Sequence, residues 1–216
     1  MNEPVVFGAA YSVYVRMVRL ALEEKQVPYS LVEIDIFALG GPPSDYLLRH
    51  PFGRIPAFEH QGFRLYEAGA ITRYVDDTFP GSALQPTQPK PRARMNQVIS
   101  ILDSYAYRTL LLDIFLERVR APQRGRQPDE DRIRSALPVA GKCLDALQDI
   151  MGDGLFLCGA DLSLADLHAA PMFAYFVRAP EGAALLAERA GLHRWWDRMS
   201  KRASMTATHS PHEDQT

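Results

Sequence analysis

The sequence predicts an α/β domain of roughly 80 residues followed by an all-α domain. Short strand-like runs alternate with helical patterns in the first part, and strand signals are absent from the second. Between them, four of the chain's 16 prolines fall within 12 residues, which is typical of a semi-rigid linker. We therefore place an α/β domain at 1–80, a linker at 81–91, a helical domain at 92–202 and a polar, flexible tail at 203–216.

The first domain opens with a β-α-β order. Val5 to Phe7 is a short apolar run that ends at Gly8, which predicts a buried strand. A helix is expected from Ser12, the N-cap, to about Lys25, because apolar side chains recur there at helical spacing at Val15, Val18 and Leu22. Tyr29 to Ile34 predicts the second strand.

A hairpin and a helix complete this domain. One or two helical turns are expected at 44–48. The runs 57–60 and 63–66 flank Gln61-Gly62, which predicts a β-hairpin. A helix over 69–79 is then stopped by Pro80.

The second domain has only helical patterns. One long helix is expected from Arg92 to about Arg120. Asp129 caps a second, with Pro138 inside it, and Ser163 caps a third. Further helical segments are expected at 182–190 and at 192 to about 202.

Composition narrows the possible functions. The 24 basic and 26 acidic side chains nearly balance, which argues against a nucleic-acid binder. Uncharged runs are far shorter than the ~20 residues of a membrane helix, and no basic start precedes the first apolar run, so we expect a cytoplasmic protein. Cys143 and Cys158 are too few for a disulfide framework, and histidine spacing does not indicate a metal site.

Three positions could meet a ligand, and each also has a plain structural explanation. Ser12 opens a helix, where free N–H groups favour an anion, but serine is also a common N-cap. A cis Pro56 would present the Ile55 backbone to a ligand, although a simple turn proline also fits. Glu67 precedes a helix, where an acid either binds an amine or favours the helix N-terminus.

The segment Ser163-Leu164-Ala165-Asp166 predicts a capping box, in which serine and aspartate satisfy free N–H groups of the same helix. His168, two residues further on, is interpreted as a packed histidine and not as a ligand.

Taken together, four stretches resemble the glutathione S-transferase family. Residues 51–57 and 65–74 are similar to the N-P-F-G-x-[VI]-P-A…L-[FY]-E-S-x-A-I-x-x-Y pattern of serine-type classes such as phi. Residues 18–22 resemble the first helix of the zeta class, and residues 159–171 resemble the family's buried helix. The resemblance covers about Val5 to Met199.

The resemblance implies a thioredoxin-like N-terminal domain that binds glutathione as co-substrate, without a metal, followed by the all-α domain. Ser12 would be the catalytic serine, and Ile55 beside cis-Pro56 would hold the cysteinyl backbone. Glu67 and Ala68 would hold the γ-glutamyl group. The small hydrophobic electrophile would meet a set of residues on the first long helix of the second domain: Tyr105, Tyr107, Arg108, Leu111 and Leu112. Homodimerisation is also implied.

Two positions depart from the family pattern. Ala68 replaces the serine that binds the glutamyl group, and Gly41-Pro42 aligns where phi-type enzymes carry a His-Lys pair for the glycyl carboxylate. We expect Arg54 to substitute as the cation. These losses predict weaker glutathione binding.

The predicted function is detoxifying glutathione transfer, in which the enzyme stabilises a thiolate that attacks an electrophilic carbon or a peroxide oxygen. Two alternatives stay open: a non-catalytic binding or scaffold member of the family, and a glutathione-dependent isomerase or dehalogenase. A cysteine-based reductase fits less well because Ser12 stands where a thiol would be needed.

Overall fold

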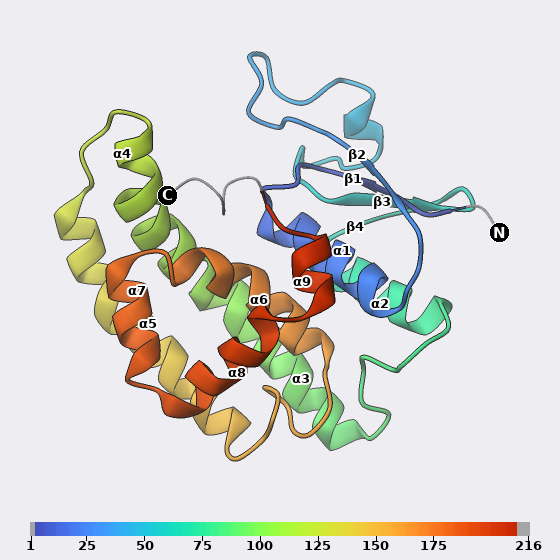
Figure 1. Ribbon diagram of the computed structural model, residues 1–216. Helices are drawn as coiled ribbons and strands as arrows, with labels where there is room; N and C mark the ends of the chain where they lie inside the picture. The colour runs from blue at the N-terminus through green and yellow to red at the C-terminus, as the bar shows by residue number, and fades with distance from the viewer. Residues whose placement is uncertain (1–2, 211–216) are drawn as a thin grey trace. The chain divides into compact units, whose positions relative to one another are not determined.

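The computed structural model describes residues 3–210, and its chain divides into two compact units (Figure 1). One unit contains the chain up to Leu84 together with the segment that begins at Ala203, and the other is Gln85–Arg202.

The first unit contains a four-stranded sheet. Its strands are β1 (Val5–Phe7), β2 (Ser30–Val32), β3 (Ala57–His60) and β4 (Phe63–Tyr66), in the order β2-β1-β3-β4. The β1 and β2 strands are parallel, so a crossover helix must join them, whereas β3 pairs antiparallel with both β1 and β4. This topology confirms the predicted β-α-β start and the hairpin at Gln61-Gly62.

Two helices cover one side of this sheet. Helix α1 (Val13–Glu24) and helix α2 (Ala68–Thr78) pack against each other and against the strands, below the sheet in Figure 1. The predicted apolar stripe of α1 is fully buried, at Val15, Val18 and Leu22. A single 3₁₀ turn, η1 (Tyr46–Leu48), lies in the connection between β2 and β3.

The end of the described chain corrects one expectation. Residues Ala203–Ala207 form helix α9, which packs on α1. The buried Arg16 guanidinium donates to Thr208 Oγ1 at 3.2 Å and to the Met205 carbonyl at 2.9 Å. The prediction of a flexible tail is therefore wrong for Ala203 to Ser210, because a buried cation needs acceptors and the backbone of this segment supplies them. Residues 211–216 of the predicted tail lie outside the described residues.

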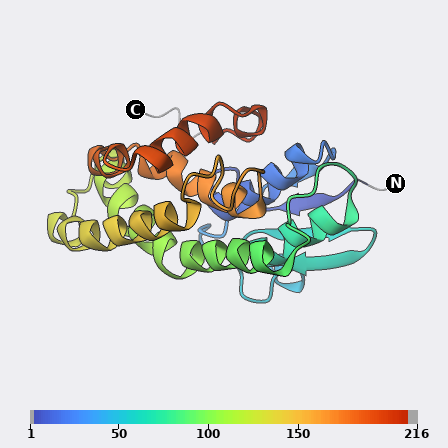
Figure 2. The same ribbon diagram turned by 90° about the horizontal axis from the view of Figure 1, so that it is seen from below.

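The second unit is helical, as predicted. Helix α3 (Pro89–Ile101) continues into η2 (Leu102–Arg120) and α4 (Ala121–Gln123), and the unit is completed by α5 (Glu130–Met151), α6 (Leu164–Phe176), α7 (Pro180–Ala187) and α8 (Ala190–Ser200). Every residue of α6 is buried, which makes this helix the centre of the core. Figure 2 shows α5, in yellow, running beside the green helix that contains η2.

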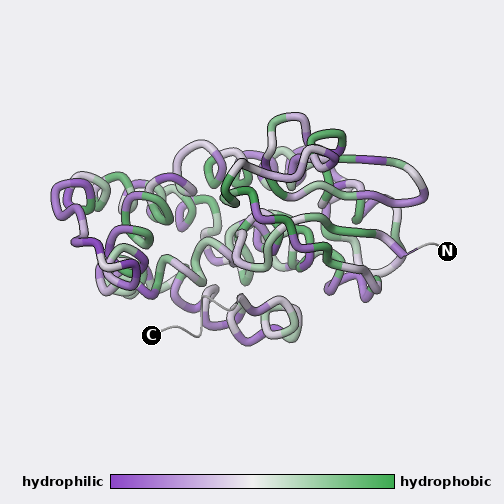
Figure 3. The backbone as a smooth tube through the Cα atoms, turned by 90° about the horizontal axis from the view of Figure 1, so that it is seen from above, coloured by the Kyte–Doolittle hydropathy of each residue, from purple (hydrophilic) through white to green (hydrophobic). Residues whose placement is uncertain are grey.

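The long first helix of this unit differs from a regular α-helix. Segment η2 has π-type geometry, and at its end the Ala121 N–H donates to the Leu116 carbonyl, five residues back. Beyond it, the loop at 124–129 is strongly polar and appears purple in Figure 3. Asp129 then caps α5 by accepting a hydrogen bond from Arg132 N at 2.9 Å, as predicted.

The buried start of α6 also forms as the sequence predicts. Ser163 and Asp166 make the capping box, and Asp166 further accepts from Trp195 Nε1 and from the Leu157 N–H, each at 2.8 Å. Within residues 3–210, no helix combines the length and apolar character needed to cross a membrane.

Candidate active site

Ser12 lies at the junction between strand β1 and helix α1. Its side-chain oxygen accepts a hydrogen bond from the Val15 backbone N–H at 3.4 Å, so it is the N-cap of α1. An oxygen that accepts this bond still carries its own O–H hydrogen for donation. The helix N-terminus adds unpaired N–H groups and the positive end of the helix dipole. This half-buried position therefore suits an anionic sulfur or oxygen.

The loop that carries Ser12 is held by three further hydrogen bonds. The Gly8 N–H donates to Val32 O at 2.9 Å, the Ala10 N–H donates to Glu33 Oε1 at 3.2 Å, and the Ser12 N–H donates to Ala9 O at 3.0 Å. Glu33 was not among the sequence-predicted site residues, and only its place after a strand could have indicated this role.

The cis-proline turn lies next to this loop. The Ile55–Pro56 bond is cis, which confirms the prediction made from the surrounding motif. A Cβ atom placed on Gly8 would lie 3.3 Å from Ile55 Cβ and would collide with Val15 at 2.4 Å. Only glycine fits there, and the resulting close approach brings the Ser12 loop and the Ile55 turn together.

Glu67 has an unusual backbone. Its φ of 71° and ψ of 113° lie in a region that residues other than glycine rarely occupy. Such a conformation typically costs about 1–3 kcal/mol of strain energy. Its side chain is exposed and makes no capping hydrogen bond, while its carbonyl accepts from Ala70 and Ile71 at the start of α2. Ala68, the next residue, is buried. Such strain commonly marks a functional position.

His50 packs against Tyr66 and was not among the residues predicted from the sequence. It is 2% exposed, its ring centroid lies 4.8 Å from that of Tyr66, and within the described residues its Nδ1 has no hydrogen-bond partner. Burial lowers the pKa of His50, the Glu67 carboxylate acts in the opposite direction, and the Arg54 cation adds a smaller lowering effect. The pKa of His50 therefore depends on Glu67 and Arg54, the two charged residues that the resemblance assigns to glutathione binding. No sequence pattern indicated His50.

The five predicted electrophile-pocket residues all lie on η2. Tyr105 and Arg108 are exposed, Tyr107 and Leu112 are half-buried, and Leu111 is buried. Arg108 Nε approaches Asp113 Oδ2 at 3.6 Å, where the arginine side chain is exposed and the aspartate side chain is largely buried.

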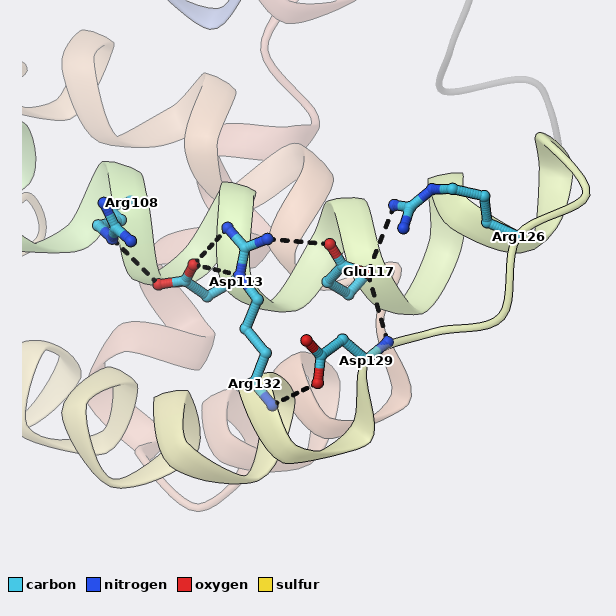
Figure 4. Close-up of polar contacts among 6 residues, drawn as sticks. All are labelled: Arg108, Asp113, Glu117, Arg126, Asp129 and Arg132. Carbon is cyan, nitrogen blue, oxygen red and sulfur yellow. Dashed lines mark hydrogen bonds and ion pairs between the residues drawn. The ribbon is translucent and has the colours of Figure 1, made fainter.

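Asp113 belongs to a larger ion-pair network, drawn in Figure 4. Arg132 of α5 donates to Asp113 at 2.7 Å and to the buried Glu117 at 3.0 Å. Glu117 also accepts from the Asp129 backbone N–H at 3.3 Å. The network ties the polar loop and the start of α5 to η2, so these side chains have a structural role.

Among residues 3–210, no group of three or more His, Cys, Asp and Glu side chains is arranged to hold a metal ion. Burial raises the pKa of Cys158 to about 12, so this thiol stays protonated at neutral pH.

The chain belongs to the glutathione S-transferase family. The family models for the "Glutathione S-transferase, N-terminal domain" and the "Glutathione S-transferase, C-terminal domain" match residues 6–83 and 130–198. A glutathione S-transferase from Hyoscyamus muticus is 30% identical over 172 residues, which are 79% of this chain and 81% of the relative. The predicted family and fold are thereby confirmed.

Among the curated relatives are plant glutathione S-transferases of the serine-type phi class. Glutathione S-transferase F13 from Arabidopsis thaliana is 27% identical over 91% of this chain and 90% of its own. The crystal structure of glutathione transferase F2 from Populus trichocarpa has a TM-score of 0.85 at 28% identity, covering 95% of this chain and 96% of that chain. Glutathione transferase F7 from the same tree has a TM-score of 0.81 at 29% identity, covering 95% and 97%.

Proposed function

We propose that this protein is a serine-type glutathione transferase that stabilises the glutathione thiolate for attack on a small electrophile or a peroxide. The observation that carries the proposal is the place of Ser12. Its hydroxyl stands at the N-terminus of α1, on a loop that Gly8 brings against the cis Ile55–Pro56 turn.

The central chemical task is to ionise a thiol near pH 7. A free thiol has a pKa near ~8.5, and lowering it by two units requires about 2.7 kcal/mol of preference for the thiolate. A hydrogen bond from Ser12 to the sulfur and the dipole of α1 are together of this size. Serine is too weakly acidic to serve as a base, so the thiol proton leaves to solvent.

The ionised sulfur then acts as the nucleophile. It donates an electron pair to the electrophilic carbon, the bond to the leaving group breaks, and the leaving group departs with that electron pair. With a hydroperoxide, the sulfur attacks the terminal oxygen, so that an S–O bond forms as the O–O bond breaks and glutathione becomes its sulfenic acid. The departing alkoxide takes a proton from solvent to give the alcohol, and a second glutathione thiol converts the sulfenic acid to the disulfide and water.

Recognition of glutathione is proposed to combine backbone groups with two charged side chains. Ile55 beside Pro56 would pair with the cysteinyl unit, and Glu67 with the N–H of Ala68 would hold the γ-glutamyl group. Arg54 would supply the cation for the glycyl carboxylate. The strained φ of Glu67 supports its place in this scheme, because such strain is typical of ligand-binding positions.

An aromatic pair beside Ser12 supports an apolar electrophile. The rings of Tyr11 and Phe37 are stacked with centroids 6.5 Å apart, and Phe37 is 78% exposed. Apolar and aromatic surface of this kind suits an aromatic or alkyl substrate. Tyr105, Tyr107, Arg108, Leu111 and Leu112 stay a prediction from the resemblance.

We further propose a cytoplasmic homodimer. The first unit exposes large apolar side chains near its β2–β3 connection, at Leu48 and Phe52, which are 77% and 71% exposed. Such surface is typical of an interface. Sedimentation equilibrium would give twice the chain mass if the proposal holds and 24.2 kDa if the protein is a monomer.

Calorimetric titration with glutathione tests the proposed function. We expect saturable binding, and the ultraviolet absorbance of the bound thiolate should titrate about two pH units below free glutathione. Absence of binding would reject the proposal. Binding without a lowered thiol pKa would favour the non-catalytic alternative. Two features already favour testing that alternative: Ala68 lacks a hydroxyl, and Gly41, at φ 83°, has no side chain to bind the glycyl carboxylate.

A further inference from the structure

Tyr46 is buried directly behind the cis-proline turn. It is the buried residue of the 3₁₀ turn η1 and is 1% exposed. Its hydroxyl donates a hydrogen bond of 2.6 Å to the Arg54 carbonyl, and the Ala57 backbone N–H lowers the pKa of the same hydroxyl. The hydroxyl therefore anchors the start of the segment Arg54-Ile55-Pro56-Ala57.

Ile55 itself does not hold this turn in place through backbone bonding. Among the described residues, neither its N–H nor its C=O makes a backbone hydrogen bond. A residue whose backbone must pair with a ligand has to keep these groups available, so the turn needs support from its neighbours. Tyr46 supplies that support from outside the turn.

We propose that Tyr46 is a positioning residue for glutathione recognition, whose hydroxyl sets the direction of the Ile55 backbone by clamping the Arg54 carbonyl. The inference deepens the proposed function and rests on it. Tyr46 does not touch glutathione in this scheme. It acts through Ile55, because a peptide plane anchored at one end presents the next N–H and C=O in one orientation.

The Tyr46 hydroxyl stays protonated across the neutral pH range and can therefore donate its hydrogen bond there. Desolvation by burial raises the pKa of Tyr46 to about 12, against the opposing effects of the Ala57 N–H and the Arg49 charge. The contribution of the Tyr46 hydrogen bond to glutathione affinity should therefore be independent of pH across the neutral range. The effect of Ser12 on ionisation of the glutathione thiol, in contrast, should depend on pH.

Tyr46→Phe is the direct test, because it removes the hydroxyl and keeps the ring. Tyr74→Phe is the matched control: Tyr74 lies in the same unit, and its hydroxyl makes a 2.9 Å hydrogen bond to His60 Nδ1. For both variants and the wild type we would measure the melting temperature, the calorimetric Kd for glutathione, and KM for glutathione and for 1-chloro-2,4-dinitrobenzene. Exchange of the Ile55 and Ala57 amide hydrogens, followed by NMR, reports on the turn without ligand.

We expect Tyr46→Phe to raise the Kd and KM for glutathione about fivefold, with kcat at saturating glutathione and KM for the electrophile nearly unchanged. Amide exchange at Ala57 should become faster. Tyr74→Phe should lower the melting temperature by a similar amount and leave the Kd for glutathione within about twofold of wild type.

Two failures are distinguishable. If wild-type protein binds no glutathione, the proposed function fails and the positioning role fails with it. If wild type binds but Tyr46→Phe binds equally well, or both tyrosine variants lose affinity equally, only the role of Tyr46 is overturned. If Tyr46→Phe is too unstable for titration, amide exchange at Ala57 is compared between the two variants well below their melting temperatures. Exchange that is no faster in Tyr46→Phe than in Tyr74→Phe would also overturn the role of Tyr46.

Discussion

The Ser12 side-chain oxygen and the Val15 backbone N–H are joined by a hydrogen bond of 3.4 Å, which is long for an N-cap. A long bond contributes little to helix stability. The Ser12 hydroxyl can therefore be removed at a small structural penalty, which makes its chemical role open to direct measurement.

Replacing Ser12 should affect chemistry more than stability. We expect Ser12→Ala to destabilise the fold by about 1 kcal/mol or less, and to raise the apparent pKa of bound glutathione by a unit or more, about 1.4 kcal/mol. The rate–pH profile of conjugation and the melting temperature measure the two effects separately.

Tyr11→Phe and Tyr14→Phe are the controls, because both hydroxyls lie close to Ser12 in the sequence. Neither should move the thiol pKa. A variant of Ser12 that melts earlier but keeps the wild-type rate–pH profile would show that Ser12 is only a cap.

Restoring a hydroxyl at position 68 should tighten glutathione binding. Ala68 is buried at the start of α2, directly after Glu67, so a serine there can add one hydrogen bond to the γ-glutamyl group. One such bond is worth roughly 0.5–1.5 kcal/mol, which predicts a Kd about two- to tenfold lower for Ala68→Ser. Ala70→Ser, at an exposed position of the same helix, should leave the Kd unchanged. Equal affinity of both variants would mean that the glutamyl group binds elsewhere.

Stability should depend on pH through His50. Burial lowers the pKa of His50 in the folded protein below its usual 6.5, so the unfolded chain binds more protons than the folded one as the pH falls below about 6.5. Stability contributed by neutral His50 is therefore present above that pH and lost below it. Urea unfolding between about pH 8 and pH 5 should show this loss, and His50→Gln should flatten the slope.

His193→Gln, at an exposed position of α8, is the matched control for this titration. If wild type and His50→Gln lose stability in parallel as the pH falls, the buried ring of His50 is not the source of the dependence.

The buried carboxylate of Asp166 is expected to depend on the indole of Trp195 for part of its stability. It accepts hydrogen bonds from Leu157 N, Ser163 N, Ser163 Oγ and Trp195 Nε1, all between 2.8 and 2.9 Å. Trp195→Phe removes one donor to a buried charge and part of a buried ring, which should cost about 2–4 kcal/mol. Trp196→Phe, one residue further and only half-buried, should cost clearly less. Chemical denaturation of both variants makes the comparison, and similar losses would argue against a special role for the indole N–H.

Local features of this protein were predictable because local spacing determines them. Helix α1 follows the apolar stripe at Val15, Val18 and Leu22, and the capping box of Ser163 and Asp166 depends on two residues three positions apart. The cis bond before Pro56 was predicted from the family resemblance and not from physical pattern alone. Ser12, Ile55 and Glu67 were singled out from their positions in the predicted elements, and the resemblance then assigned their roles, which stay predictions.

Only the tertiary structure decided which distant groups meet. Trp195 reaches Asp166 across 29 residues, and Arg16 binds the backbone of the segment after Ala203 across about 190. Tyr46, His50 and Glu33 carried no periodic signal, because their importance comes from burial and from the neighbours that the fold brings to them. Periodicity in the sequence shows which face of a helix or strand is buried. A hydrogen bond between distant residues depends instead on how several elements pack together, and the packing cannot be read from the spacing of residues in one sequence.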